Sequence, residues 1–135
     1  MILIVGGDSL IGSNLSKYWS NENIQFHAST KHLDKVTTDR PLCDLTNKVT
    51  FNSLDQYDSA VICAAITNIT KCENNPIETR KINVDGTIDL IEKLSSVGTF
   101  IIYLSTNLVF EGKHPMQKPN ANRKPNIEYG RQKAD

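Results

Sequence analysis

The sequence has no excess of either charge and no long apolar run, and each absence excludes a class of protein. Lysine and arginine together number 15, and so do aspartate and glutamate, so charge gives no reason to expect a nucleic acid or an anionic membrane as a partner. No apolar stretch approaches the ~20 residues of a transmembrane helix. The N-terminus has neither the basic segment nor the cleavage site of a signal peptide, so residues 2–5 are interpreted as a buried strand.

Cysteine is also scarce, with three residues in the chain. An odd number of cysteines without an export signal favours reduced thiols in the cytosol, so we expect a cytoplasmic protein. No pair of cysteines has the spacing of zinc ligands, so we expect no metal site.

The sequence does contain alternating strand and helix patterns. Short apolar runs predict strands at residues 2–5, 24–28, 60–65 and 99–104. Apolar residues at helical spacing predict helices at residues 10–19, at 76–97 and from Tyr129 onward, and a proline-rich loop occupies 113–127. This order predicts an α/β fold with a doubly wound, mostly parallel sheet of the Rossmann type. No repeat or linker divides the chain, so we expect one nucleotide-binding domain over residues 1–135.

A glycine-rich turn joins the first predicted strand to the first predicted helix. It contains Gly6, Gly7 and Gly12. Glycine lets two backbones approach closely, and the N–H groups at the start of a helix attract a pyrophosphate. Any tight strand-to-helix turn favours glycine, but the position after the first strand makes dinucleotide binding the better interpretation.

A second pattern combines hydroxyl groups with a tyrosine and a lysine. Ser105 and Thr106 follow the last predicted strand, and Tyr129 and Lys133 then open a helix. Residues four apart share one face of a helix. A nearby ammonium lowers the pKa of a tyrosine, as a general acid for carbonyl reduction requires. A lone pair of this spacing is common by chance, but its order after the glycine turn and the hydroxyl residues strengthens the signal.

These motifs resemble those of extended short-chain dehydrogenases, and in particular of dTDP-4-dehydrorhamnose reductases. The glycine turn is similar to their Gly-x-x-Gly-x-x-Gly, with Ser9 replacing the middle glycine, a change that a negative φ at Ser9 would accommodate. Ser105-Thr-Asn-Leu-Val-Phe-Glu-Gly112 is close to their Ser-Thr-Asp-Tyr-Val-Phe-Asp-Gly, and Tyr129-Gly-Arg-Gln-Lys133 resembles their Tyr-Gly-x-x-Lys. The resemblance covers nearly the whole chain.

The resemblance implies a role for each matching residue. Thr106 would bind the substrate carbonyl, Tyr129 would be the general acid, and Lys133 would lower its pKa and hold the nicotinamide ribose. Asp44 would bind the adenine amino group, although an aspartate at a strand end is more often a turn former. The implied cofactor-binding residues are Gly6, Ser9, Leu10, Ile11, Gly12, Thr30, Lys31, Asp44, Leu45, Ala64, Ala65, Asn83, Tyr129 and Lys133.

The end of the second predicted strand bears on the choice of cofactor. NAD-preferring sites place a carboxylate there, but residues 27–32 contain none. Thr30 and Lys31 offer a hydroxyl and a charge to a 2′-phosphate instead. We therefore predict NADPH, with NADH as the alternative, although a surface lysine is usually just solvated.

The expected function is reduction of a nucleotide-linked 4-keto-6-deoxy sugar. One alternative is an epimerase or dehydratase, which Asn107 disfavours because many dehydratases place a carboxylate after the catalytic hydroxyl. Another is a non-catalytic subunit that binds nucleotide and serves a partner enzyme.

The chain ends at Asp135, whereas the family continues. We therefore expect the C-terminal substrate domain to be absent and residues 1–135 alone to be inactive, with the Tyr–Lys pair on a frayed end. A homodimer through the long helix is a further expectation.

Overall fold

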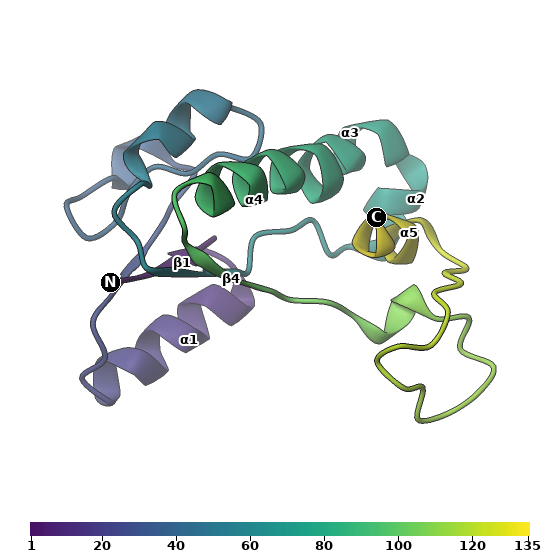
Figure 1. Ribbon diagram of the computed structural model, residues 1–135. Coiled ribbons are helices and arrows are strands. Elements are labelled where there is room, and N and C mark those ends of the chain that lie inside the picture. Colours follow the sequence, from purple (N-terminus) through teal and green to yellow (C-terminus); the bar gives the residue numbers. More distant parts are fainter. The chain divides into compact units, whose positions relative to one another are not determined.

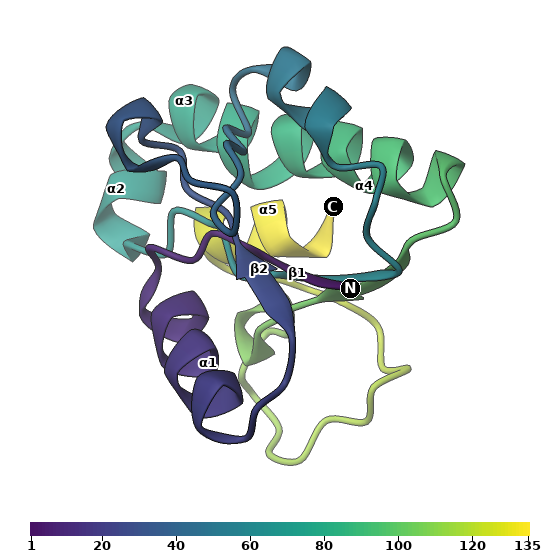
Figure 2. The same cartoon turned by 90° about the vertical axis from the view of Figure 1, so that its left-hand side faces the viewer.

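Four short apolar segments form a parallel sheet in the order β2-β1-β3-β4 (Figure 1). The strands are β1 (Ile2–Val5), β2 (Phe26–Ala28), β3 (Ser59–Ile62) and β4 (Phe100–Tyr103). Helices α1 (Leu10–Asn21) and α4 (Thr87–Ser96) lie on opposite faces of this sheet (Figures 1 and 2). The predicted doubly wound Rossmann-type fold is therefore confirmed, and every predicted strand is present, although β2, β3 and β4 are shorter than predicted.

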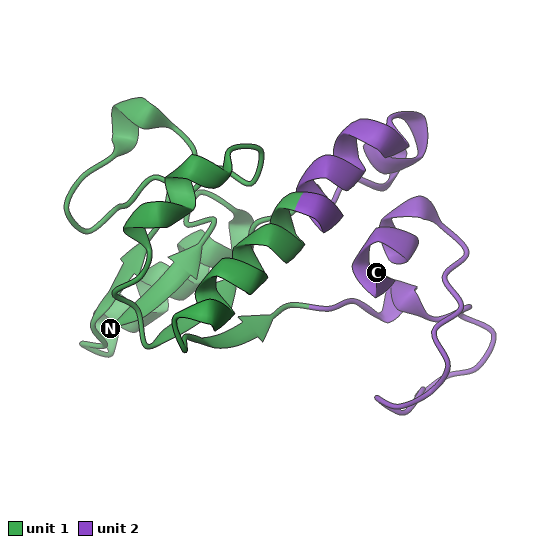
Figure 3. Ribbon diagram, turned by 45° about the horizontal axis from the view of Figure 1, so that its top comes forward, with its two compact units in different colours: residues 1–65, 86–104 green, residues 66–85, 105–135 purple.

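This computed structural model describes all residues 1–135, which form two units (Figure 3). The first unit contains residues 1–65 and 86–104, and the second contains residues 66–85 and 105–135. The sheet, α1 and α4 belong to the first unit. The prediction of one domain over residues 1–135 stays a prediction.

Strand β4 is more exposed than the apolar run at residues 99–104 suggests. It lies at the edge of the sheet, and its exposure alternates along the strand. Phe100 is 68% exposed and Ile102 is 46% exposed, on the face that carries Val61 in the neighbouring strand. Within this unit α4 covers only the opposite face of β4. The apolar run indicated a strand but could not show that one of its faces lacks cover.

The segment after β2 supplies one further backbone contact beside the sheet. Thr30 and Leu42 form an isolated parallel bridge, in which the Thr30 N–H donates to the Pro41 carbonyl over 3.0 Å. Proline has no N–H to extend a ladder, so no full strand forms there. This bridge brings residues 39–43 alongside the end of β2.

The predicted helix over residues 76–97 is present as three consecutive segments. They are α3 (Pro76–Arg80), a π-helical turn (Lys81–Gly86) and α4. Pro76 begins α3, as expected of proline in a first helical turn. A Cβ at Gly86 would lie 1.9 Å from the Leu45 carbonyl oxygen, so only glycine fits that position. Ile77 in α3 and Ile88 in α4 are 77% and 41% exposed, so the helical spacing of apolar residues did not by itself identify buried positions.

The second unit contains helices that flank the proline-rich loop. Helix α2 (Ile69–Asn74) was not predicted, whereas α5 (Glu128–Ala134) begins within one residue of its predicted start. Residues 113–127 form no helix or strand, as predicted. None of the helices is both long and apolar enough to cross a membrane.

Candidate functional site

The glycine turn after β1 is closely packed at three positions. Gly6 has a φ of +83°, and a Cβ there would lie 2.8 Å from the Cα of Ala64. A Cβ at Gly12 would lie 2.3 Å from the Gly6 carbonyl oxygen, and one at Gly7 would lie 2.8 Å from the Cβ of Ala28. The glycines therefore serve close backbone packing, which also accounts for the small residue at Ala64.

Ser9 occupies the position of the family's middle glycine without backbone strain. Its φ is −72°, so the expected negative φ is present. Its hydroxyl accepts a 3.0 Å hydrogen bond from the Gly12 N–H. Ser9 is thus the N-cap of α1. The N–H groups of Leu10 and Ile11 lie in the first turn, where a helix has no partners of its own for them. They fit a bound phosphate, since this end of α1 carries the positive end of its dipole.

The end of β2 holds a carboxylate that sequence reasoning missed. Asp8, from the glycine turn, accepts a 2.6 Å hydrogen bond from the hydroxyl of Thr30, which is buried. It also pairs with the guanidinium of Arg40. Burial alone would raise the pKa of Asp8, but the Thr30 hydrogen bond and then the charge of Arg40 outweigh it and hold that pKa below its ordinary value. Lys31 is exposed, and its role stays a prediction.

Asp44 and Leu45 follow the bridge beside β2 and have structural contacts of their own. One oxygen of Asp44 accepts hydrogen bonds from the N–H and the hydroxyl of Thr46, at 2.9 and 2.8 Å. This is the turn-forming geometry that the sequence analysis gave as the alternative. Leu45 is buried where Gly86 passes it. Ala64 and Ala65, after β3, are partly exposed.

Helix α5, in the second unit, presents Tyr129 and Lys133 one turn apart. Lys133 is only 7% exposed, and burial lowers the pKa of its ammonium to about 8. Burial, and then the charge of a Cys72 thiolate, raise the pKa of Tyr129. The expected lowering by Lys133 is therefore not what this structure shows. The physical reason is desolvation, which disfavours the charged form of both groups.

Thr106 heads the short 3₁₀ turn Asn107–Val109, which lies against α5. Its hydroxyl accepts from the Leu108 N–H over 3.3 Å and contacts the Asn107 side-chain oxygen at 3.4 Å. A Cβ at Gly130 would lie 2.2 Å from the Leu108 carbonyl oxygen, so glycine lets this turn and α5 approach closely. Thr106 and the Tyr–Lys helix thus belong to one packed substructure.

A buried pair of amide side chains, Asn83 and Gln132, holds α5 in place within the second unit. The side-chain N–H₂ of Asn83 donates to the side-chain oxygen of Gln132 over 2.8 Å, and Gln132 in turn donates to the Thr79 hydroxyl over 2.9 Å. Asn83 also exchanges two hydrogen bonds with the backbone of Ile66, at 2.7 and 2.9 Å. The side-chain amide of Asn83 is therefore engaged in holding the helix, and its predicted contact with a cofactor stays a prediction. Gln132 was missed because a polar residue between Tyr129 and Lys133 gives no sign of burial.

Helix α5 was expected to be frayed, but contacts with the rest of the second unit hold it in place. The Glu128 N–H donates to the Glu73 carboxylate over 2.6 Å, and Arg80 pairs with Asp135 at 2.7 Å. The argument from helix length was wrong for this segment because tertiary contacts supply what a short isolated helix lacks.

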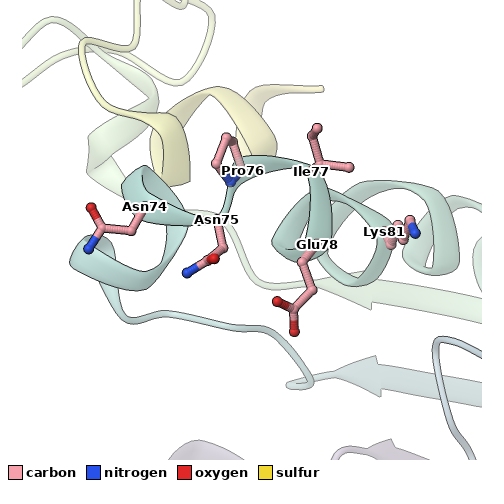
Figure 4. Close-up of a pocket in the computed structure, with 6 residues that line it drawn as sticks. All are labelled: Asn74, Asn75, Pro76, Ile77, Glu78 and Lys81. Atoms are coloured by element: carbon pink, nitrogen blue, oxygen red, sulfur yellow. The ribbon is translucent and has the colours of Figure 1, made fainter.

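A hollow of about 330 Å³ lies at the turn between α2 and α3 (Figure 4). It is lined by Asn74, Asn75, Pro76, Ile77, Glu78 and Lys81, none of which is a predicted site residue. No group of His, Cys, Asp or Glu side chains is placed to hold a metal ion.

Known proteins are similar to this chain in sequence and in fold. The chain is 35% identical over 104 residues to a dTDP-4-dehydrorhamnose reductase of Sinorhizobium fredii, covering 74% of this chain and 35% of the relative. It is 28% identical over 140 residues to methionine adenosyltransferase 2 subunit beta of Pongo abelii, covering 99% of this chain and 40% of the relative. A structure of dTDP-4-dehydrorhamnose reductase from Bacillus anthracis in complex with NADP superposes with a TM-score of 0.84 at 24% identity, covering 98% of this chain and 45% of that one.

The chain therefore spans less than half the length of these relatives. The model of the family described as RmlD substrate binding domain matches residues 1–135. With the Rossmann-type sheet, the glycine turn and the Tyr–Lys helix in place, the chain belongs to the RmlD substrate binding domain family.

Proposed function

We propose that the protein is an NADPH-dependent reductase that acts on a nucleotide-linked 4-keto-6-deoxy sugar. The observation that carries the proposal is the burial of Lys133 one turn from Tyr129 on α5, beside the turn headed by Thr106. Placing an ammonium out of water costs stability, so such groups concentrate at functional sites. The likeness to the S. fredii reductase supplies the substrate class.

The residues divide the chemistry between them. A bound nicotinamide would supply the hydride. The Thr106 hydroxyl would hold the substrate carbonyl oxygen, and Tyr129 would give that oxygen its proton. Lys133 would hold the nicotinamide ribose and, once charged beside the tyrosine, stabilise the phenolate that remains. The first turn of α1 would bind the pyrophosphate through its backbone N–H groups.

The test uses the protein at its natural length, with NADPH and a nucleotide-linked 4-keto-6-deoxy sugar. We expect oxidation of NADPH that falls at least about a hundredfold in Tyr129→Phe, the usual scale of a general acid. Tyr18→Phe, at an exposed tyrosine of α1, is the matched control. Near-normal turnover in Tyr129→Phe would overturn the mechanism. Conversion of a sugar without net oxidation of NADPH would indicate an epimerase instead. We expect residues 1–135 alone to bind nucleotide without turnover.

The second candidate is a non-catalytic subunit that binds nucleotide and serves a partner enzyme. It is favoured by the 28% identity, over 99% of this chain, to a protein named as a subunit of methionine adenosyltransferase. The presence of Thr106, Tyr129 and Lys133 together speaks for catalysis. Stable co-purification with a larger enzyme whose kinetics change, with no turnover by the protein itself, would favour the subunit. Homodimerisation also stays a prediction.

A further inference from the structure

A cluster of opposed charges at the end of β2 belongs neither to the glycine turn's packing nor to the Tyr–Lys helix. Asp8 lies at its centre, with one carboxylate oxygen on the Thr30 hydroxyl and the other on Arg40. Lys35 lies 3.9 Å from the same oxygen as Arg40. The side chains of Asp8 and Arg40 are 29% and 34% exposed, so the pair lies at the surface with one side open to solvent.

The position of this cluster gives it a meaning for nucleotide binding. In dinucleotide-binding folds the adenosine ribose lies at the end of the second strand, where a carboxylate binds its hydroxyls or a cation binds a 2′-phosphate. Asp8 places a carboxylate 2.6 Å from Thr30, just past the end of β2, although it comes from the glycine turn. Arg40 reaches the same point from the segment that pairs with Thr30 through Leu42.

Arg40 has donor capacity that the protein leaves unused. Its Nε atom is buried and has no hydrogen-bond partner, although buried polar groups in proteins are nearly always paired. A guanidinium presents several donors that suit a phosphate, whereas one carboxylate uses only part of them. Because 34% of the Arg40 side chain is exposed, a second acceptor besides Asp8 can approach its guanidinium from solvent.

We propose that Asp8 and Arg40 together set the preference between NADPH and NADH. Arg40 binds the 2′-phosphate of NADPH, and Asp8 disfavours that phosphate. This inference rests on the proposed nucleotide binding. A 2′-phosphate must share or displace the contact between Arg40 and Asp8, and it meets the negative charge of that carboxylate. A 2′-hydroxyl can instead donate to Asp8. The opposed pair therefore weakens the preference for NADPH over NADH that Arg40 alone would give.

The proposal predicts opposite shifts from the two charge changes. Asp8→Asn keeps an oxygen for Thr30 but removes the charge, so the ratio of NADPH to NADH affinity should rise about tenfold, the scale of one charged hydrogen bond. Arg40→Gln should lower the same ratio by about as much. Asp34→Asn is the matched control, because it makes the same change in net charge at an aspartate that has no ion pair with Arg40. It should leave the ratio unchanged.

The measurement is calorimetric titration of the protein with NADPH and NADH, repeated with adenosine 2′,5′-bisphosphate and 5′-AMP. The two smaller probes carry the 2′-phosphate difference without the nicotinamide, so they report on this cluster even if a variant disturbs the rest of the site. Equal ratios in wild type, Asp8→Asn and Arg40→Gln would overturn the proposal, as would a larger effect from Lys31→Gln than from Arg40→Gln. Failure of the wild type to bind any of the four probes would instead overturn nucleotide binding itself.

Discussion

Replacing Lys133 with methionine should remove a specific dependence of stability on pH. Lys133 is 7% exposed, and burial lowers its pKa from an ordinary value of 10.5 to about 8. Below pH about 8 the lysine is charged in both the folded and the unfolded chain, so the folded chain then carries a partly desolvated ammonium, which lowers its stability. Methionine fills a similar volume without that charge.

The sign of the effect follows from which state binds the proton. Between pH about 8 and about 10.5 the unfolded chain keeps the proton on Lys133 while the folded chain has lost it. The unfolded state then binds more protons, so the free energy of unfolding rises with pH in this window. The rise in the free energy of unfolding has an upper limit of roughly 3 kcal/mol. The pKa of Lys133 falls from 10.5 to about 8, and each pKa unit corresponds to about 1.4 kcal/mol.

The assay is urea unfolding followed by far-ultraviolet circular dichroism, from about pH 7 to about pH 10. Cys43 titrates with the opposite sign, because burial raises its pKa to about 12. Its contribution is the same in both proteins and cancels in the difference between wild type and Lys133→Met. That difference should grow with pH in favour of the wild type. Lys17→Met, at an exposed position on α1, is the control. A difference that stays constant would refute the argument that the ammonium is desolvated.

Three further substitutions test the local packing. Gly6→Ala should cost at least about 1–2 kcal/mol, because alanine is strained at a φ of +83° and meets Ala64; a thermal midpoint equal to that of the wild type would contradict this. Ser9→Ala should lose about 1 kcal/mol with the N-cap of α1, whereas Ser9→Gly should lose only a few tenths, and urea unfolding distinguishes the two. Gln132→Leu should cost about 1–3 kcal/mol by leaving a donor of Asn83 unpaired. The double variant with Asn83→Leu should cost less than the sum of the two single changes, as a double-mutant cycle would measure.

Local sequence patterns were sufficient to predict the framework of the fold. Short apolar runs located all of the strands, and the glycine turn, the hydroxyl residues and the Tyr–Lys spacing predicted a nucleotide-binding half and a Tyr–Lys helix. Such features depend on residues close together in the chain, where periodicity and backbone preference leave a direct trace. The condition on Ser9, a negative φ, could likewise be stated from its place in the turn.

Tertiary structure alone decided which side chains meet. Asp8 and Arg40 are 32 residues apart, and Asn83 and Gln132 are 49 apart, so no local pattern links them. The exposure of Phe100 and the upward shift of the Tyr129 pKa depend on what covers each group, which is a property of packing. Hydrophobic periodicity records that a residue prefers burial, but it carries no information on whether a neighbour is present to bury it. For that reason the sequence determined the framework and the candidate residues, and only the folded chain determined their partners and their charge states.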